Sequence, residues 1–145
     1  GKQHKYYVYD LTNSEEVSNL VESMQKEYES LDILVNVAGI GIYKNLEQTS
    51  LSDWKASFDT NVTAPFLLIQ GLLPLLQKTK GSFVLNIGSG AGNIPMRGRS
   101  MYCATKYALR GLTLSLSEEF KDKSPRFYLI TLGSTLTNFS VKSVY

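Results

Sequence analysis

The feature of this sequence that most constrains the fold is the alternation of strand-like and helix-like patterns along the chain. Apolar runs at 31–37, 82–87 and 126–132 are typical of strands, and the segments 50–77 and 100–120 carry apolar residues at helical spacing. The first two runs are so uniformly apolar that we expect strands buried on both faces. The alternation predicts an α/β fold with a parallel sheet, and 145 residues suit one domain.

The N-terminal part of the chain predicts one further strand and one helix. Lys5–Asp10, rich in tyrosine and valine, is typical of a short strand followed by a turn. Thr12 and Glu15 have the spacing of a capping box, and apolar residues at helical spacing continue from there to Tyr28. A helix is therefore expected over this stretch.

The central helical segments differ in character. Ser50 and Asp53 form a second capping box that opens a helix. After Asn61, the segment Val62–Gln77 continues as helix and is apolar nearly all round. We therefore expect one of its faces to cover the sheet and another to meet a further apolar surface, in this chain or in another subunit. The helix Ser100–Phe120 is expected to run beside it.

An apolar surface made by two neighbouring helices usually marks an interface between subunits. We therefore expect a homo-oligomer that assembles through helices 62–77 and 100–120, with Leu72 and Leu76 facing outward. The last residues, 133–145, are rich in serine and threonine and predict a loop or a truncated sheet edge.

Charge, cysteine content and hydropathy exclude several kinds of partner. A net charge of +2 without long charged blocks argues against nucleic acid and against an anionic membrane surface. No apolar stretch approaches the roughly 20 residues of a membrane span, and no secretory signal is visible. Cys103 is the single cysteine, which favours the reducing cytoplasm. His4 is the single histidine, so we expect no metal site.

The candidate chemistry begins with a tyrosine and a lysine on one helix. Tyr102 and Lys106 are four residues apart, so they share a helix face, where the ammonium favours the tyrosinate form. Such a pair also arises by chance in a chain with 9 tyrosines. Ser89 strengthens the interpretation because it follows the strand 82–87 in a glycine-rich loop, and ligands gather at the carboxyl ends of parallel strands.

Several motifs in this order resemble the short-chain dehydrogenase/reductase family. The family's catalytic Tyr-x-x-x-Lys motif and its serine match the three residues above. Its other motifs match Asp10-Leu11 after a strand, Asn36-Val37-Ala38-Gly39 with one substitution, the helix residue Asn61, and Leu132-Gly133-Ser134-Thr135-Leu136-Thr137 without the family's proline. The resemblance covers the chain from Asp10 to Thr137.

The resemblance implies hydride transfer between NAD or NADP and a small-molecule carbonyl or secondary alcohol. In that case Tyr102 acts as general acid or base, Ser89 binds the substrate oxygen, and Lys106 holds the nicotinamide ribose. Asn61 positions a water that relays protons; the alternative is that it is only a turn residue between two helical pieces. The resemblance also points to homodimers or homotetramers.

The remaining matched residues are expected to bind the cofactor. Asp10 and Leu11 lie at the adenine, although Asp10 would also suit a helix-leading acid. At the end of the strand 31–37, Asn36, Ala38 and Gly39 allow a close approach to the backbone. Thr137 contacts the carboxamide.

The chain departs from the family at its ends. The glycine-rich turn that seats the pyrophosphate is absent, as is the strand after it. We therefore expect a Rossmann-like doubly wound sheet that lacks its first two strands and its C-terminal end, with residues 1–145 as a single truncated dinucleotide-binding and catalytic domain. An alternative is a catalytically inactive fragment or paralogue that acts as an oligomerisation or binding module.

Overall fold

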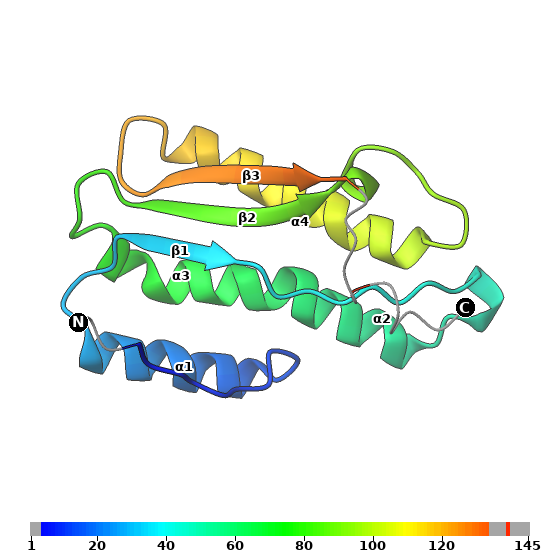
Figure 1. Ribbon diagram of the computed structural model, residues 1–145, viewed down its shortest axis with the longest axis horizontal. Coiled ribbons are helices and arrows are strands. Elements are labelled where there is room, and N and C mark those ends of the chain that lie inside the picture. The colour runs from blue at the N-terminus through cyan, green and yellow to red at the C-terminus, as the bar shows by residue number, and fades with distance from the viewer. Residues whose placement is uncertain (1–3, 134–138, 140–145) are drawn as a thin grey trace.

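The computed structural model describes residues 4–133 and Phe139. In this part of the chain, three strands form a parallel sheet (Figure 1). The strands are β1 (Ile33–Asn36), β2 (Phe83–Ser89) and β3 (Arg126–Leu132), in the order β1-β2-β3. Both neighbouring pairs are parallel. The predicted parallel α/β architecture is confirmed, and the 126–132 strand has the predicted bounds.

The structure describes four α-helices, which are interspersed with the strands along the chain. They are α1 (Ser14–Glu27), α2 (Leu51–Phe58), α3 (Ala64–Leu76) and α4 (Ser100–Glu119). The Ser50–Asp53 capping box is present at the start of α2. A π-helical turn, Asp59–Thr63, joins α2 to α3, so the expected helix from residue 62 begins with irregular backbone. No helix within the described residues is long and apolar enough to cross a bilayer.

One face of the sheet is covered by helices. Val84 of β2 and Phe127 of β3 are in register, and both belong to an apolar cluster with Ile69 and Leu76 of α3. Leu116 of α4 packs against the same cluster. The helices α3 and α4 therefore cover the same face. Beyond this cluster α4 packs on β2, β3, α2 and the π-helical turn.

The opposite face of the sheet is exposed within this chain. Ile33, Val35 and Ile130 retain 47%, 46% and 44% of their accessible surface. Residues that point to the other face, such as Val84 and Phe127, are buried. The expectation of strands buried on both faces is therefore wrong for the described residues, because the helices that pack on the sheet lie on one side.

The second apolar face of α3 is covered by α1. Val21 of α1 packs against Leu72 and Leu75, and the two helices approach so closely that a Cβ atom on Gly71 would lie 2.5 Å from a methyl of Val21. Leu72 and Leu76 are 3% and 0% exposed. These two leucines do not face outward. The sheet and α1 cover the apolar side chains of α3 for which the sequence pattern alone showed no packing partner.

The segment 5–10 is extended but forms no strand, contrary to expectation. The Tyr9 hydroxyl lies 3.3 Å from the Ser23 hydroxyl, and the Tyr7 hydroxyl donates to Glu27, so the segment lies along α1. The cap of α1 also differs from the predicted one. Asn13 Oδ1 accepts from the amides of Glu15 and Glu16, at 3.0 and 3.4 Å. Thr12 instead donates its hydroxyl to Asp10.

Candidate active site

The candidate site lies where β2 ends and α4 begins. Ser89 is the last residue of β2, and its hydroxyl accepts from the amide of Ala91 at 3.2 Å, which starts a 3-10 turn over Gly90–Gly92. This turn packs against α4. Tyr102 and Lys106, both on α4, are 7% and 6% exposed. The predicted trio of serine, tyrosine and lysine is therefore gathered at the carboxyl end of β2.

Tyr102 is held by aromatic contacts and titrates above its ordinary range. Its ring meets the ring of Tyr43 edge to face, with centroids 5.4 Å apart. Burial raises the pKa of Tyr102, and a hydrogen bond from the Ser89 side chain and the charge of Arg99 act in the opposite direction. Desolvation of the phenolate outweighs these two favourable contacts.

Lys106 is directed at the end of the neighbouring strand. Its ammonium donates to the Ile87 carbonyl at 3.0 Å and lies 5.8 Å from the centroid of the Tyr102 ring. Burial lowers the pKa of Lys106 because the charged form loses hydration. A Cβ atom on Gly39 would lie 3.7 Å from this ammonium. Gly39 therefore lies directly beside the lysine.

Asn61 ties the loop after β1 to α4. The side chain is fully buried in the π-helical turn. Its Oδ1 accepts from the Ile40 amide at 2.8 Å, and its Nδ2 donates to the Ile40 carbonyl at 2.9 Å and to Thr105 Oγ1 at 3.0 Å. Both amide protons are used, so the side chain holds the loop in place. Asn61 therefore also joins two helical pieces, which was the alternative to a catalytic role.

Asn36 belongs to a buried polar network that crosses the sheet. Its Nδ2 donates to Asn86 Oδ1 at 2.7 Å, and Asn86 Nδ2 donates to Thr113 Oγ1 at 2.9 Å. The Thr113 hydroxyl completes the chain by donating to the Leu109 carbonyl. Sequence analysis missed Asn86 and Thr113, although an asparagine inside an apolar strand run was the available signal.

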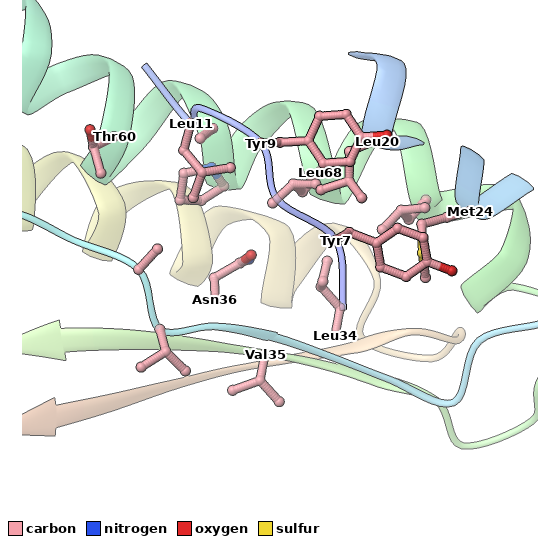
Figure 2. Close-up of a pocket in the computed structure, with 15 residues that line it drawn as sticks. Tyr7, Tyr9, Leu11, Leu20, Met24, Leu34, Val35, Asn36, Thr60 and Leu68 are labelled. Carbon is pink, nitrogen blue, oxygen red and sulfur yellow. The ribbon is translucent and has the colours of Figure 1, made fainter. Parts of the chain in front are cut away.

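Three of the expected cofactor residues line one cavity. Leu11 precedes α1, and Asn36 and Ala38 lie at the end of β1 and just after it; all three border a cavity of about 420 Å³, drawn in Figure 2. The remaining lining is mostly apolar. Asp10 lies next to Leu11, with its carboxylate accepting from the amide and hydroxyl of Thr12, both at 2.8 Å; these bonds lower the pKa of Asp10. Thr137 lies outside the described residues.

An apolar cavity of this kind can take a planar aromatic group, and Asp10 directly precedes its lining residue Leu11 in the chain. In the loop after β1, a Cβ atom on Gly39 would lie 3.2 Å from Asn61 Oδ1, so a side chain there would crowd Asn61. Tyr102 and Lys106 offer a hydroxyl and an ammonium for a ribose.

Two residues at this site were not found by sequence analysis. Tyr43 is 8% exposed and packs on Tyr102. The guanidinium carbon of Arg99 lies 4.4 Å from the centroid of the Tyr43 ring. Arg99 is the residue before α4 and precedes Tyr102 by three positions, which was the available signal for a shared helix face.

A parallel α/β sheet with serine, tyrosine and lysine at its carboxyl edge is the architecture of a Rossmann-like, dinucleotide-dependent oxidoreductase domain. The family model described as short chain dehydrogenase matches residues 1–144. The chain therefore belongs to the short-chain dehydrogenase family, which confirms the resemblance carried by the sequence motifs.

Curated relatives agree with this assignment. The chain is 33% identical over 131 residues to 2,3-dihydro-2,3-dihydroxybenzoate dehydrogenase of Escherichia coli, a match that covers 90% of this chain and 53% of the relative. It is 32% identical over 142 residues to serine 3-dehydrogenase of Agrobacterium fabrum, which covers 97% and 57%. The chain thus spans about half the length of these relatives.

Solved structures are similar as well. A short chain dehydrogenase from Salmonella enterica serovar Typhi matches with a TM-score of 0.85 at 27% identity, over 94% of this chain and 57% of that chain. A metagenomic short-chain oxidoreductase in complex with NADP matches with a TM-score of 0.81 at 30% identity, over 88% and 58%. The incomplete Rossmann-like fold is therefore confirmed.

Proposed function

We propose that this protein is an NAD(P)-dependent oxidoreductase that interconverts a carbonyl group and a secondary alcohol, and that residues 1–145 are its truncated dinucleotide-binding and catalytic domain. The observation that carries the proposal is the convergence of Ser89, Tyr102 and Lys106 at the carboxyl end of β2. Family membership supports it, as does the NADP bound in a similar structure.

Each residue has a physical task in this proposal. NAD(P)H, when bound, supplies the hydride that the carbonyl carbon gains. Tyr102 gives its phenolic proton to the developing alkoxide and takes a proton back in the oxidative direction. The Ser89 hydroxyl donates to the same substrate oxygen. Lys106 binds the nicotinamide ribose, and its charge favours the tyrosinate once cofactor and substrate displace water.

The other expected residues support the cofactor. Asp10 and Leu11 would bind the adenine, and Asn36, Ala38 and Gly39 form the strand end along which the cofactor lies. Asn61 and Thr137 would act at the nicotinamide end: Asn61 by holding the loop and a relay water, and Thr137 at the carboxamide. These roles are proposals that rest on the family's motifs.

Replacement of Tyr102 tests the function in the complete protein. Tyr102→Phe keeps the ring and removes the proton, so turnover should fall by roughly 10²-fold or more while cofactor affinity is retained. Tyr107→Phe is the matched control, because Tyr107 is on the same helix and 43% exposed. Retained turnover in the Tyr102 variant would sink the assignment and favour the inactive module.

We also propose that the complete protein is a homodimer or homotetramer through helices 62–77 and 100–120. Leu72 and Leu76 are buried, whereas Phe66 on α3 and Leu114 on α4 are apolar residues that are 42% and 47% exposed. Phe66→Asp and Leu114→Asp should lower the sedimentation coefficient. Leu46→Asp, at a residue that is 81% exposed elsewhere, is the control. A monomeric wild type at micromolar concentration contradicts the proposal.

The cytoplasm is the location we propose for this protein. Cys103 is the single cysteine and is buried in α4 against Tyr43 and Ala91, so it is a free thiol in the fold. Cell fractionation of the complete protein tests the location.

A further inference from the structure

A positive charge stands beside the candidate proton donor. The guanidinium of Arg99 lies over the ring of Tyr43, with its carbon 4.4 Å from the ring centroid, and Tyr43 in turn contacts Tyr102 at 5.4 Å between centroids. The guanidinium carbon therefore lies within about 10 Å of the Tyr102 ring centroid. A substrate several atoms long that reaches Tyr102 can also reach this charge.

The guanidinium has no carboxylate partner within the described part of the chain. The ion pairs there join Lys5 to Glu27, Lys26 to Glu22, Lys44 to Asp53 and Lys121 to Glu118. Among the described residues, the hydrogen bond recorded for the Arg99 side chain runs from Nη1 to the sulfur of Met96 at 3.7 Å. Thioether sulfur is a weak acceptor, so most of the five N–H donors remain available.

The position of Arg99 over the Tyr43 ring suits recognition of a carboxylate. The N–H groups of a guanidinium lie around the edge of its plane, so contact of the guanidinium carbon with a ring leaves N–H groups that can donate. Two of these groups can donate in parallel to one carboxylate, which is the strongest pairing available to an arginine. The stacking on Tyr43 also fixes the side chain, because Tyr43 is itself buried. Less conformational freedom is then lost when a substrate binds.

We propose that Arg99 anchors a carboxylate of the substrate, so that the protein acts on short oxo acids and hydroxy acids whose carbonyl or hydroxyl lies at Tyr102. This inference rests on the proposed function. In the reductive direction the carbonyl carbon gains a hydride from NAD(P)H, the carbonyl oxygen gains a proton from Tyr102, and the carboxylate stays ionised at Arg99. The nicotinamide is oxidised, and no bond to the carboxylate changes.

A different role for Arg99 would have a different kinetic signature. If Arg99 acted only through its charge on Tyr102, its loss would slow neutral and anionic substrates alike. If Arg99 only packed on Tyr43, its loss would lower stability without any preference between substrates. Only if Arg99 binds the substrate carboxylate should its replacement lower kcat/KM for acids more than for amides.

The test compares acids with their amides in the complete protein. The probes are 2-oxobutanoate, 3-oxobutanoate and 4-oxopentanoate, each with the matching amide, which keeps the shape and removes the charge. The wild type should prefer at least one acid over its amide in kcat/KM. Arg99→Met should reduce this preference by roughly 10- to 100-fold, because a hydrogen-bonded charge pair is lost. Arg99→Lys should retain part of it. Arg97→Met, at an exposed neighbouring arginine, should leave it unchanged.

The possible results separate this inference from the proposed function. If the wild type prefers no acid, or if Arg99→Met slows acids and amides equally, the anchor is refuted while Tyr102-dependent turnover still supports the oxidoreductase. If Tyr102→Phe leaves turnover intact, the proposed function itself fails. Thermal unfolding of Arg99→Met and Arg99→Lys shows whether either variant has lost its fold. If Arg99→Met is unfolded, the preference of Arg99→Lys for acids over amides tests the proposal instead.

Discussion

Gly92 and Lys106 are packed so closely that a Cβ atom on Gly92 would lie 2.8 Å from the carbonyl oxygen of Lys106. This contact joins the turn after Ser89 to the helix of Tyr102 and Lys106, so it sets the separation of the proposed catalytic groups. A backbone carbonyl cannot relieve such a contact by changing rotamer, as a side chain can. A side chain at Gly92 must therefore move the turn away from α4.

Gly92→Ala should lower both turnover and stability in the complete protein, because displacement of the turn shifts Ser89 relative to Tyr102. We expect a loss of about 10-fold or more in kcat, measured by steady-state kinetics. Gly111→Ala is the control: it lies in α4 with open space around it, and should stabilise the helix by up to about 1 kcal/mol. Equal kinetics for wild type and Gly92→Ala would contradict the packing argument.

Lys106→Met and Ser89→Ala should separate cofactor binding from catalysis. Since Lys106 is proposed to bind the ribose as well as to influence Tyr102, Lys106→Met should weaken cofactor affinity and reduce kcat. Ser89→Ala removes one donor to the substrate oxygen, so kcat should fall by roughly 10²-fold with little change in cofactor affinity. Fluorescence titration of NADH and NADPH, together with kinetics, measures both. The reverse pattern for Ser89 would mark it as a loop hydroxyl that caps the turn.

Asn61→Ala should destabilise the fold and disturb the site together. The variant leaves the Ile40 amide and carbonyl and the Thr105 hydroxyl without the partners they have now. An unsatisfied buried polar group costs about 1–3 kcal/mol, so urea unfolding should show a loss of at least that size. Asn93→Ala, at an exposed position, should change little. Stability unchanged in Asn61→Ala would show that the loop after β1 does not depend on this side chain.

Because of the cap of α2, the free energy of unfolding should depend on pH in the acid range. A hydrogen bond from Lys44, and then those from Ser50, lower the pKa of Asp53 from 3.8 to about 2. Because the folded pKa lies below the unfolded value, this contribution is complete above the ordinary pKa and is lost as pH falls toward 2. Asp53→Asn should therefore be destabilised relative to wild type at about pH 7, with a smaller difference at about pH 2, as measured by denaturant unfolding.

A companion variant isolates the hydroxyl of the same cap. Ser50→Ala should cost about 1 kcal/mol at any pH. A difference between wild type and Asp53→Asn that does not depend on pH would contradict the titration of Asp53.

Tyr102 should titrate above its ordinary range in the cofactor-free protein. Burial disfavours the phenolate and raises the pKa above 10.0. In a spectrophotometric difference titration of wild type against Tyr102→Phe, the extra phenolate should therefore appear only above that pH. Binding of NAD⁺ or NADP⁺ should move it to lower pH, because a positive charge favours the anion. Since the folded pKa is raised, the wild type should also lose stability more steeply than the variant as pH rises through it.

Local patterns were sufficient for most of the regular structure. The cap at Ser50 and the bounds of β3 depend on hydrogen bonds and side-chain alternation within a few residues, so the sequence predicts them directly. The same kind of reasoning misplaced the cap of α1 by one residue, since Thr12 and Asn13 are both good capping residues and only the backbone turn at Asp10 decides between them.

Tertiary structure decided the properties that depend on distant residues. Whether 5–10 forms a strand depends on a neighbouring strand, and among the described residues its partner is α1 instead. Burial of Leu72 and Leu76 depends on how α1 and the sheet surround α3.

The candidate site divides in the same way. The sequence by itself determined which residue types stand at Ser89, Tyr102 and Lys106 and that strands and helices alternate, because spacing along the chain is enough for both. Only the packed structure decided the raised pKa of Tyr102, the pairing of Asn36 with Asn86, and the place of Arg99 over Tyr43. Desolvation and contacts between separate elements are set by the three-dimensional arrangement of the whole chain, which local spacing does not encode.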